Sequence, residues 1–283
     1  MVFGYIPDFK NKNPLIDTLL KIIGLPILHR RIQARSIIRM LKGSNMGKMM
    51  DLCCGDGIFS IEFAKRGWNY VIGIDIDKES IKLGKKRSKI MKLENVEFIL
   101  CDAECLPLKN ECFNVVLCNC ALEHIKNDEK AIEETYRVLV KNGIFILTVP
   151  SEKRRIILPL ISFWIHMPKT LRKILAPKYL WEDAKTPEEA IWRLKKERFK
   201  EYRNYPPKGL FKLLEEKGFK ICEWEYNIKL FGALMWDLIL GIRLIHLNMG
   251  MIFMFPIMFP ISLLDEILPK HFRGEEFAVK AIK

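Results

Sequence analysis

Three acidic residues and a glycine-rich turn have the types and spacing needed to bind a small ligand. Asp51 precedes Gly55 and Gly57 where an apolar run gives way to a helical pattern. Glycines let the backbone approach a ligand closely, and the first turn of a helix offers free N–H groups. Asp75 and Asp102 lie at the ends of the next two apolar runs. Because carboxylates accept hydrogen bonds, the three acids favour a ligand that offers donors.

The elements that must position these acids alternate between strand-like and helical patterns. The expected strands are Met49–Cys53, Tyr70–Asp75, Val96–Cys101, Phe113–Cys118, Ile144–Val149, Phe219–Asn227 and Glu276–Lys283. The expected helices are Phe59–Arg66, Lys78–Met91, Asp128–Val140 closed by Asn142-Gly143, and Gly209–Lys217 after Pro206-Pro207. This alternation over residues 49–150 is typical of an α/β fold with a parallel sheet. Such sheets bind ligands in a crevice outside the carboxyl ends of their strands, which is where the three acids fall.

Composition supports an ordinary globular chain. Of its 283 residues, 49% are apolar and 29% are charged, which excludes a disordered, collagenous or heptad-repeat protein. Seven of the eight cysteines fall between Cys53 and Cys120, within the expected sheet, so buried reduced thiols are expected rather than a disulfide scaffold. The opening MVFGYIPDFK has no secretion-signal pattern. We therefore expect a cytoplasmic protein.

The net charge of +13 comes from segments outside the expected core. Residues 1–48 hold nine basic and two acidic residues, and residues 151–205 hold 14 and 7. Residues 49–150 hold 14 basic and 16 acidic residues and are nearly neutral. One interpretation is that the two flanks meet an anionic surface, either nucleic acid phosphates or lipid headgroups. The other is that they are solvated, lysine-rich helix faces.

About a hundred residues resemble the class I S-adenosyl-L-methionine-dependent methyltransferases, and most of all the branch of ubiquinone and menaquinone biosynthesis methyltransferases. The matching motifs occur in the family's order. They are Asp51-Leu-Cys-Cys-Gly55-Asp-Gly57, Ile74-Asp75, Asp102-Ala103-Glu104-Cys105-Leu106-Pro107-Leu108, Ala121-Leu122-Glu123-His124 and Arg137-Val138-Leu139-Val140-Lys141-Asn142-Gly143. The resemblance implies a Rossmann-like, seven-stranded, mostly parallel sheet with an antiparallel last strand and helical lid insertions. It also implies S-adenosyl-L-methionine as the cofactor.

The resemblance also assigns a role to each part of the cofactor site. The glycine turn would lie against the methionine moiety, Asp75 would bind the ribose hydroxyls, and Asp102-Ala103 would meet the adenine. The predicted cofactor-binding residues are Asp51, Cys53, Gly55, Gly57, Asp75, Ile76, Asp102, Ala103, Cys118 and Asn119.

Three residues bear on how closely the site follows the family. Cys53 replaces the usual first glycine and would narrow the methionine pocket, and Asn114 replaces a common aspartate. Ser60 stands where a dinucleotide-binding turn needs its third glycine, which disfavours hydride transfer.

Glu123 and His124 are the predicted catalytic residues, in the turn where the acceptor should approach the methyl group. His124 would act as a general base for a hydroxyl or enol acceptor, or the turn would only orient the acceptor. Relatives of the resembling branch hold a divalent ion with two glutamates and a histidine here, and Cys120 replaces the first glutamate. Although Cys120, Glu123 and His124 have the chemistry of zinc ligands, we expect no metal.

The chain divides into an N-terminal basic helical segment (1–48), a cofactor-binding core (49–150), a basic and apolar lid insertion (151–205) and the end of the core (206–283) with an apolar insertion at 228–275. Both insertions would overhang the cofactor. An apolar acceptor, such as a lipid, an isoprenoid or a quinone-like molecule, is therefore the leading expectation. The alternatives are an RNA methyltransferase and a non-catalytic, membrane-peripheral subunit with this cofactor fold.

The stretch Leu244–Leu264 contains no Asp, Glu, Lys or Arg and is long enough for a membrane span. A single span would place Glu276–Lys283 across the bilayer from the sheet that it must complete. Pro256 and Pro260 also each remove a helix hydrogen bond. We therefore expect no span, and either a lid over an apolar tunnel or peripheral contact with an anionic membrane.

Overall fold

The computed structural model describes residues 27–151, 203–235, 238 and 256–283, and four isolated positions between 14 and 24. Nearly all of the expected lid at 151–205 and the middle of the insertion at 228–275 lie outside these residues. The strands are β1 (Lys48–Leu52), β2 (Tyr70–Asp75), β3 (Val96–Leu100), β4 (Phe113–Asn119), β5 (Leu139–Pro150), β6 (Lys220–Ile228) and β7 (Glu276–Ile282). The helices with defined bounds are α2 (Leu28–Met40), α3 (Ile58–Lys65), α4 (Lys78–Ile90), η1 (Leu122–His124), α5 (Asp128–Val138), α9 (Pro207–Glu216) and η2 (Leu263–Glu266).

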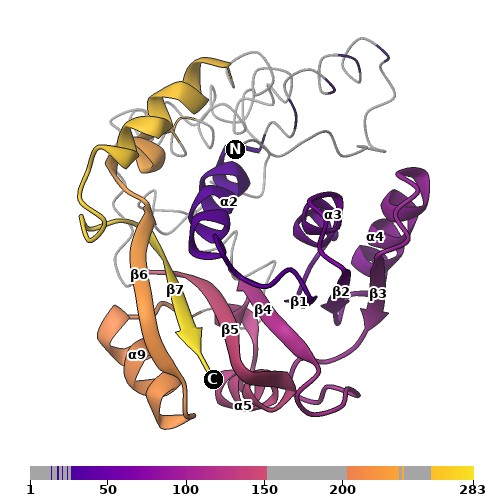
Figure 1. Cartoon of the computed structure of the whole chain (residues 1–283). Helices are drawn as coiled ribbons and strands as arrows, with labels where there is room; N and C mark the ends of the chain where they lie inside the picture. The colour runs from indigo at the N-terminus through magenta and orange to yellow at the C-terminus, as the bar shows by residue number, and fades with distance from the viewer. Residues whose placement is uncertain are drawn as a thin grey trace, which may run out of the picture.

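The seven strands form one sheet in the order β3-β2-β1-β4-β5-β7-β6 (Figure 1). Neighbours from β3 to β5 pair in parallel, and β7 runs antiparallel to both β5 and β6. The predicted mostly parallel sheet with an antiparallel last strand is therefore confirmed. β1 and β4 are neighbours at the centre of the sheet, and the chain adds β2 and β3 on one side of them and β5 on the other. Because these strands are parallel, the carboxyl ends of β1, β2 and β4 lie at the same edge of the sheet.

Helices cover both faces of the sheet, and each face has its own apolar core. α2, α3 and α4 cover one face, where Ile37, Ile58 and Ile81 pack together with buried strand residues. α5 and α9 cover the other, where Ile132 and Leu210 are fully buried. The strands are apolar on both faces because they are covered on both, which explains their nearly continuous hydrophobic runs.

The expected helix Asp128–Val140 ends earlier than its apolar pattern predicts. α5 stops at Val138, and Leu139 already pairs with Phe113 in the sheet. Asn142 has a φ of 60°, as expected for a residue that tolerates left-handed backbone, but it lies within the irregular start of β5 and closes no helix. The turn signal was thus correct and its assignment to a helix end was wrong, because sheet pairing takes over at Leu139.

Arginines of the basic N-terminal segment have partners inside the fold. On α2, Arg30 pairs with Asp56 at 2.8 Å, and Arg39 pairs with Glu266 at 2.8 Å and with Glu225 on β6. Arg31 is only 4% exposed and lies over the Phe259 ring. Much of the charge of α2 therefore binds this helix to the sheet and to the segment around η2 and does not form an open basic surface.

The two described ends of the insertion at 228–275 lie together. Asp265 in η2 accepts hydrogen bonds from the backbone N–H groups of Lys229, Phe231 and Gly232, at 2.8–2.9 Å. These are the free N–H groups at the start of the short helical run 230–235, which Asp265 caps from 33 to 36 residues away. The chain therefore leaves the sheet and returns to it at the same place. None of the helices that the structure describes is long and apolar enough to cross a membrane.

Candidate functional site

The turn after β1 passes three times through left-handed backbone. Cys53, Gly55 and Gly57 have φ angles of 56°, 54° and 74°. A Cβ at Gly57 would lie 2.4 Å from the Phe98 ring, so only glycine fits there. A Cβ at Gly55 would meet no atom within 4 Å, so the backbone at Gly55 is open to a ligand. Cys53 holds a conformation that suits glycine, which explains why glycine is usual at this position of the resembling family.

Asp75 at the end of β2 joins this turn to the next one. Its carboxylate accepts the N–H of Gly55 at 2.7 Å and the N–H of Asp77 at 2.8 Å. Asp51 lies deeper, is 2% exposed and accepts a hydrogen bond from the hydroxyl of Ser60 at 2.6 Å. Burial raises the pKa of Asp51 to about 7, and the bond from Ser60 offsets part of this rise.

Asp56, between the two glycines, anchors the turn to two helices. Its carboxylate pairs with Arg30 of α2 at 2.8 Å and with Arg87 of α4 at 2.9 Å. Arg87 also donates to the backbone oxygen of Asp56 at 2.9 Å. Burial raises the pKa of Asp56, but the two arginines outweigh it and hold that pKa below its ordinary value. The turn is therefore fixed in place before any ligand binds.

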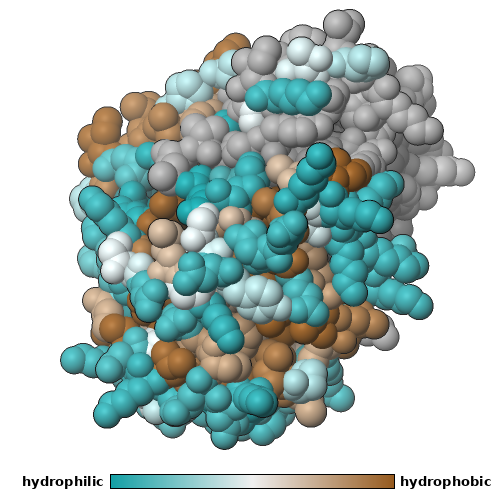
Figure 2. All heavy atoms as spheres, turned by 45° about the vertical axis from the view of Figure 1, so that its right-hand side comes forward, coloured by the Kyte–Doolittle hydropathy of each residue, from teal (hydrophilic) through white to brown (hydrophobic). Residues whose placement is uncertain are grey.

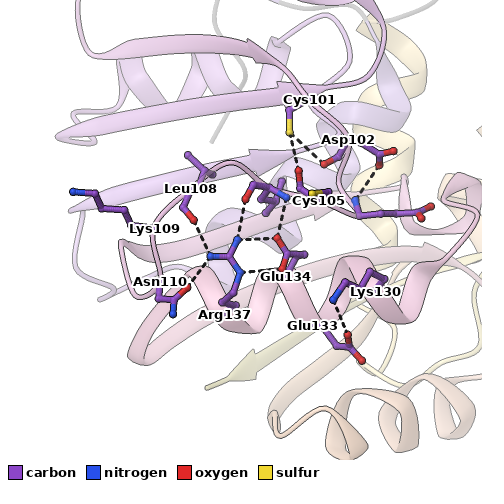
Figure 3. Close-up of polar contacts among 12 residues, drawn as sticks. Cys101, Asp102, Cys105, Leu108, Lys109, Asn110, Lys130, Glu133, Glu134 and Arg137 are labelled. Atoms are coloured by element: carbon purple, nitrogen blue, oxygen red, sulfur yellow. Dashed lines mark hydrogen bonds and ion pairs between the residues drawn. The ribbon is translucent and has the colours of Figure 1, made fainter.

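A loop after β3 carries Asp102 and is held by α5 (Figure 3). Arg137 donates to the backbone oxygens of Leu106 at 2.9 Å and Leu108 at 2.7 Å, and it makes a bidentate pair with Glu134. Glu134 in turn accepts the N–H of Leu106 at 2.9 Å. Sequence reasoning listed Arg137 among the matching motifs but missed that it supports the loop at the predicted adenine site.

The side chains expected to surround the adenine differ in exposure. Ile76 is 70% exposed and Asp102 is exposed, with one carboxylate oxygen accepting the N–H of Glu104 at 2.9 Å. Ala103 is 6% exposed. An exposed isoleucine and an exposed carboxylate that follow neighbouring strands offer an apolar face and a hydrogen-bond acceptor, which is what a flat ring with an exocyclic amine requires.

The two predicted residues at the end of β4 have different surroundings. Cys118 is fully buried in the core, and burial raises the pKa of its thiol far above the ordinary value. Asn119 accepts a hydrogen bond from Thr148 at 2.8 Å and donates to Gln33 at 3.0 Å. Its side chain therefore joins β4 to β5 and α2, which the sequence did not predict.

Glu123 and His124 form the short helix η1. Glu123 is 3% exposed and His124 is half-buried. Nε2 of His124 lies 3.9 Å from Oε1 of Glu123, too far for a hydrogen bond. Residues at the end of the expected lid at 151–205 hold this turn and the start of α5. The N–H of Arg203 donates to the backbone oxygen of Glu123 at 3.1 Å, and the Tyr205 hydroxyl donates to Asp128 at 2.7 Å.

The trio of Cys120, Glu123 and His124 considered as zinc ligands does not form. The structure instead places the Cys120 thiol 3.1 Å from a carboxylate oxygen of Glu276, the first residue of β7, whose carboxylate lies 2.7 Å from Nε2 of His29. Cys120 has a φ of 48°, so the chain turns sharply at this residue. His29 and Glu276 were missed because they are 247 residues apart and no motif joins them.

Ionisation within this group follows from its burial. Burial and the nearby Glu276 raise the pKa of the Cys120 thiol well above its usual value. Burial also raises the pKa of Glu276, but His29, Cys120 and Gln33 outweigh it and keep that pKa below the ordinary value. The carboxylate is therefore charged inside the protein.

The chain is similar in sequence to known proteins. Demethylmenaquinone methyltransferase from Listeria welshimeri is 28% identical over 138 residues, which cover 48% of this chain and 57% of that protein. The chain thus matches little more than half the length of such relatives. The Staphylococcus aureus (strain JH9) protein of the same name is 27% identical over 214 residues, covering 75% of this chain and 83% of that protein.

A solved structure extends the likeness to nearly the whole fold. Geranyl diphosphate C-methyltransferase from Streptomyces coelicolor superposes with a TM-score of 0.58 at 13% identity, covering 99% of this chain and 88% of that one. At this identity the likeness concerns the fold alone. The model of the family described as "Methyltransferase domain" matches residues 44–202, which is more than half of the 283 residues. The chain therefore belongs to the methyltransferase-domain family.

Proposed function

We propose that this chain is an S-adenosyl-L-methionine-dependent methyltransferase that acts on an apolar acceptor, such as a lipid, an isoprenoid or a quinone-like molecule. The observation that carries the cofactor assignment is the edge of the sheet where Gly55, Asp75 and Asp102 meet. Gly55 leaves open backbone, Asp75 presents a carboxylate, and Asp102 and Ile76 are both exposed. These groups match, in order, the methionine, ribose and adenine parts of the cofactor.

Positioning supplies most of the catalysis in this proposal. A sulfonium carries a good leaving group, so an acceptor atom held in line about 3 Å from the methyl carbon needs little acid–base chemistry. Residues of this chain then have two tasks. The turn held by Asp56 fixes the donor, and η1 with Glu123 and His124 orients the acceptor beside β4. His124 acts as a base only where the acceptor group must lose a proton.

The apolar acceptor is supported by side chains near the insertion. Ile257, Leu264 and Ile267 are 57%, 39% and 80% exposed. The segment 256–267 is yellow at the upper left of Figure 1, and Figure 2 shows apolar side chains gathered at the upper left of an otherwise mainly hydrophilic face. Such a patch suits an apolar molecule or the surface of a membrane. The names of two similar proteins contain demethylmenaquinone and geranyl diphosphate, and both compounds have an apolar isoprenoid chain.

Binding of the cofactor is tested first, by calorimetry with S-adenosyl-L-methionine and its demethylated product. Replacing Asp75→Ala should leave the fold intact and weaken binding by at least about 1.5 kcal/mol, or roughly tenfold. Glu94→Ala removes the same charge near the opposite edge of the sheet and should leave the affinity unchanged. Parent protein that binds neither molecule would refute the enzymatic proposal, and equal affinity of parent and Asp75→Ala would remove Asp75 from the site.

The acceptor is tested by transfer of labelled methyl groups to fractions of a cell extract. We expect label in the lipid fraction. Label confined to RNA would overturn the apolar acceptor and establish the alternative. Co-sedimentation with anionic vesicles that weakens as salt is added would support peripheral membrane contact. Failure to co-sediment with either anionic or neutral vesicles would contradict it.

A further inference from the structure

A compact set of polar side chains lies beneath α2, where β4, β5, β6 and β7 meet. Nε2 of His29, Sγ of Cys120 and a carboxylate oxygen of Glu276 all lie within 4.8 Å of one another. Oε2 of Glu276 is 2.7 Å from His29 and 3.1 Å from Cys120. Imidazole, thiolate and carboxylate are all ligands of transition metals.

A chain of hydrogen bonds fixes the orientation of the Glu276 carboxylate. Thr148 Oγ1 accepts the N–H of Cys120 at 3.0 Å, so its own proton goes to Oδ1 of Asn119 at 2.8 Å. The amide of Asn119 then donates to Oε1 of Gln33 at 3.0 Å. This orients the Gln33 amide so that its nitrogen donates to Oε2 of Glu276 at 2.8 Å. Outer-shell hydrogen bonds of this kind orient the ligands of metal sites.

The buried carboxylate of Glu276 has a further polar neighbour. Asn227 donates to Oε1 of Glu276 at 2.6 Å, and both residues are about 5% exposed or less. Oδ1 of Asn227 is buried and lacks a hydrogen-bond partner in the part of the chain that the structure describes. His29 and Cys120 are half-buried, so this centre is partly exposed on their side. A polar centre of this kind, closed on one side and accessible on the other, can admit an ion.

Nε2 of His29 has two close polar neighbours, and its role toward each depends on the tautomer of the ring. This nitrogen lies 2.7 Å from Oε2 of Glu276 and 2.8 Å from the amide nitrogen of Gln33. A protonated Nε2 donates to Glu276 but opposes the donor of Gln33, whereas an unprotonated Nε2 faces a carboxylate with its lone pair. A cation shared by the imidazole and the carboxylate would take the place of the proton between Nε2 and Oε2, and the Gln33 amide would then donate to Glu276.

We propose that His29, Cys120 and Glu276 bind a zinc ion. The donor set of one sulfur, one nitrogen and one oxygen matches zinc, and three protein ligands leave the fourth tetrahedral position for water or an acceptor atom. Binding converts the Cys120 thiol to a zinc-bound thiolate and releases its proton to solvent, with no change in oxidation state. Cys120 follows β4 directly, so the ion would lie at the same edge of the sheet as the proposed cofactor site. The proposal concerns metal affinity and stands apart from the methyl-transfer proposal.

The experiment uses the full chain after treatment with a chelator. Zinc titration by calorimetry should give one ion per chain, and cobalt in its place should show a thiolate-to-cobalt charge-transfer absorption. Cys120→Ser should abolish this absorption and weaken zinc binding by more than about 100-fold, the upper end of what loss of an outer partner costs. His29→Asn and Glu276→Gln should also weaken zinc binding strongly.

Matched controls distinguish this site from adventitious binding. Cys222→Ser and Cys105→Ser change exposed free cysteines elsewhere, and both should keep the absorption and the zinc affinity of the parent. Circular dichroism checks that each variant is folded. A folded parent that binds no zinc, or a cobalt spectrum that is unchanged in Cys120→Ser, would overturn the proposal.

Discussion

Raising the pH should destabilise the cofactor-free protein through one buried carboxyl group. Burial raises the pKa of Asp51 from 3.8 to about 7, and the hydrogen bond from Ser60 offsets only part of this. In the unfolded chain the Asp51 carboxyl group has its ordinary pKa of 3.8. Between about pH 4 and 7 the folded state therefore binds more protons than the unfolded state, and the free energy of unfolding falls as the pH rises.

The expected magnitude follows from the same interval. Each pH unit is worth about 1.4 kcal/mol, so full ionisation of Asp51 would lower the free energy of unfolding by about 4 kcal/mol at most. Replacing Asp51→Asn removes the titrating group, keeps nearly the same volume and retains an oxygen that accepts the Ser60 hydroxyl. The variant should therefore lack this contribution to the pH dependence.

Urea unfolding of parent and variant at about pH 5 and about pH 8 measures the difference. Across this range the parent should lose about 3 kcal/mol more than Asp51→Asn. Asp77→Asn is the control, because the pKa of the exposed Asp77 is lowered and this carboxylate stays charged throughout the range. Parallel pH curves for parent and Asp51→Asn would refute the reasoning.

Two further substitutions test the supports of the proposed cofactor site. Asp56→Asn should lower the free energy of unfolding by about 2–3 kcal/mol, because Arg87, with an 8% exposed side chain, loses its carboxylate partner. Glu79 pairs with Lys82 on the exposed surface of α4, so the control Glu79→Gln should cost under about 1 kcal/mol. Arg137→Gln should cost about 2 kcal/mol and loosen the loop at 102–110, seen as faster hydrogen exchange there, whereas Lys130→Gln should do neither. Equal stability of Asp56→Asn and Glu79→Gln, or unchanged exchange in Arg137→Gln, would contradict these expectations.

The sequence predicted the parts of the molecule whose signals are local. Asp51, Asp75 and Asp102 lie at or near the carboxyl ends of three expected strands, so strand spacing alone predicted that they lie at one edge of the sheet. The mostly parallel sheet with an antiparallel last strand followed from the family resemblance. Asn142-Gly143 shows the limit of local signals, because a turn signal does not tell whether a helix or a strand surrounds it, and the pairing of Leu139 with Phe113 decides.

The polar centre beneath α2 could not be predicted in this way. His29 comes from the first described helix and Glu276 from the last strand, so their meeting depends on how the whole chain folds back. Cys120 was expected to join Glu123 and His124 because they are near in sequence. The sharp backbone turn at Cys120 and the pairing of β7 beside β5 direct it to Glu276 instead.

The cap that Asp265 forms has a consequence for how this chain can change over time. Asp265 ties residues 229–232 to η2, and Met235 and Met258 pack in one apolar cluster, so the intervening chain starts and finishes at a single anchored point. The entropy of closing a loop grows slowly with its length, and each doubling costs only about 0.6 kcal/mol. Insertions, deletions and new apolar residues between Met235 and Met258 therefore have little effect on the stability of the sheet. Changes there leave the turn that Gly55 and Asp75 form untouched.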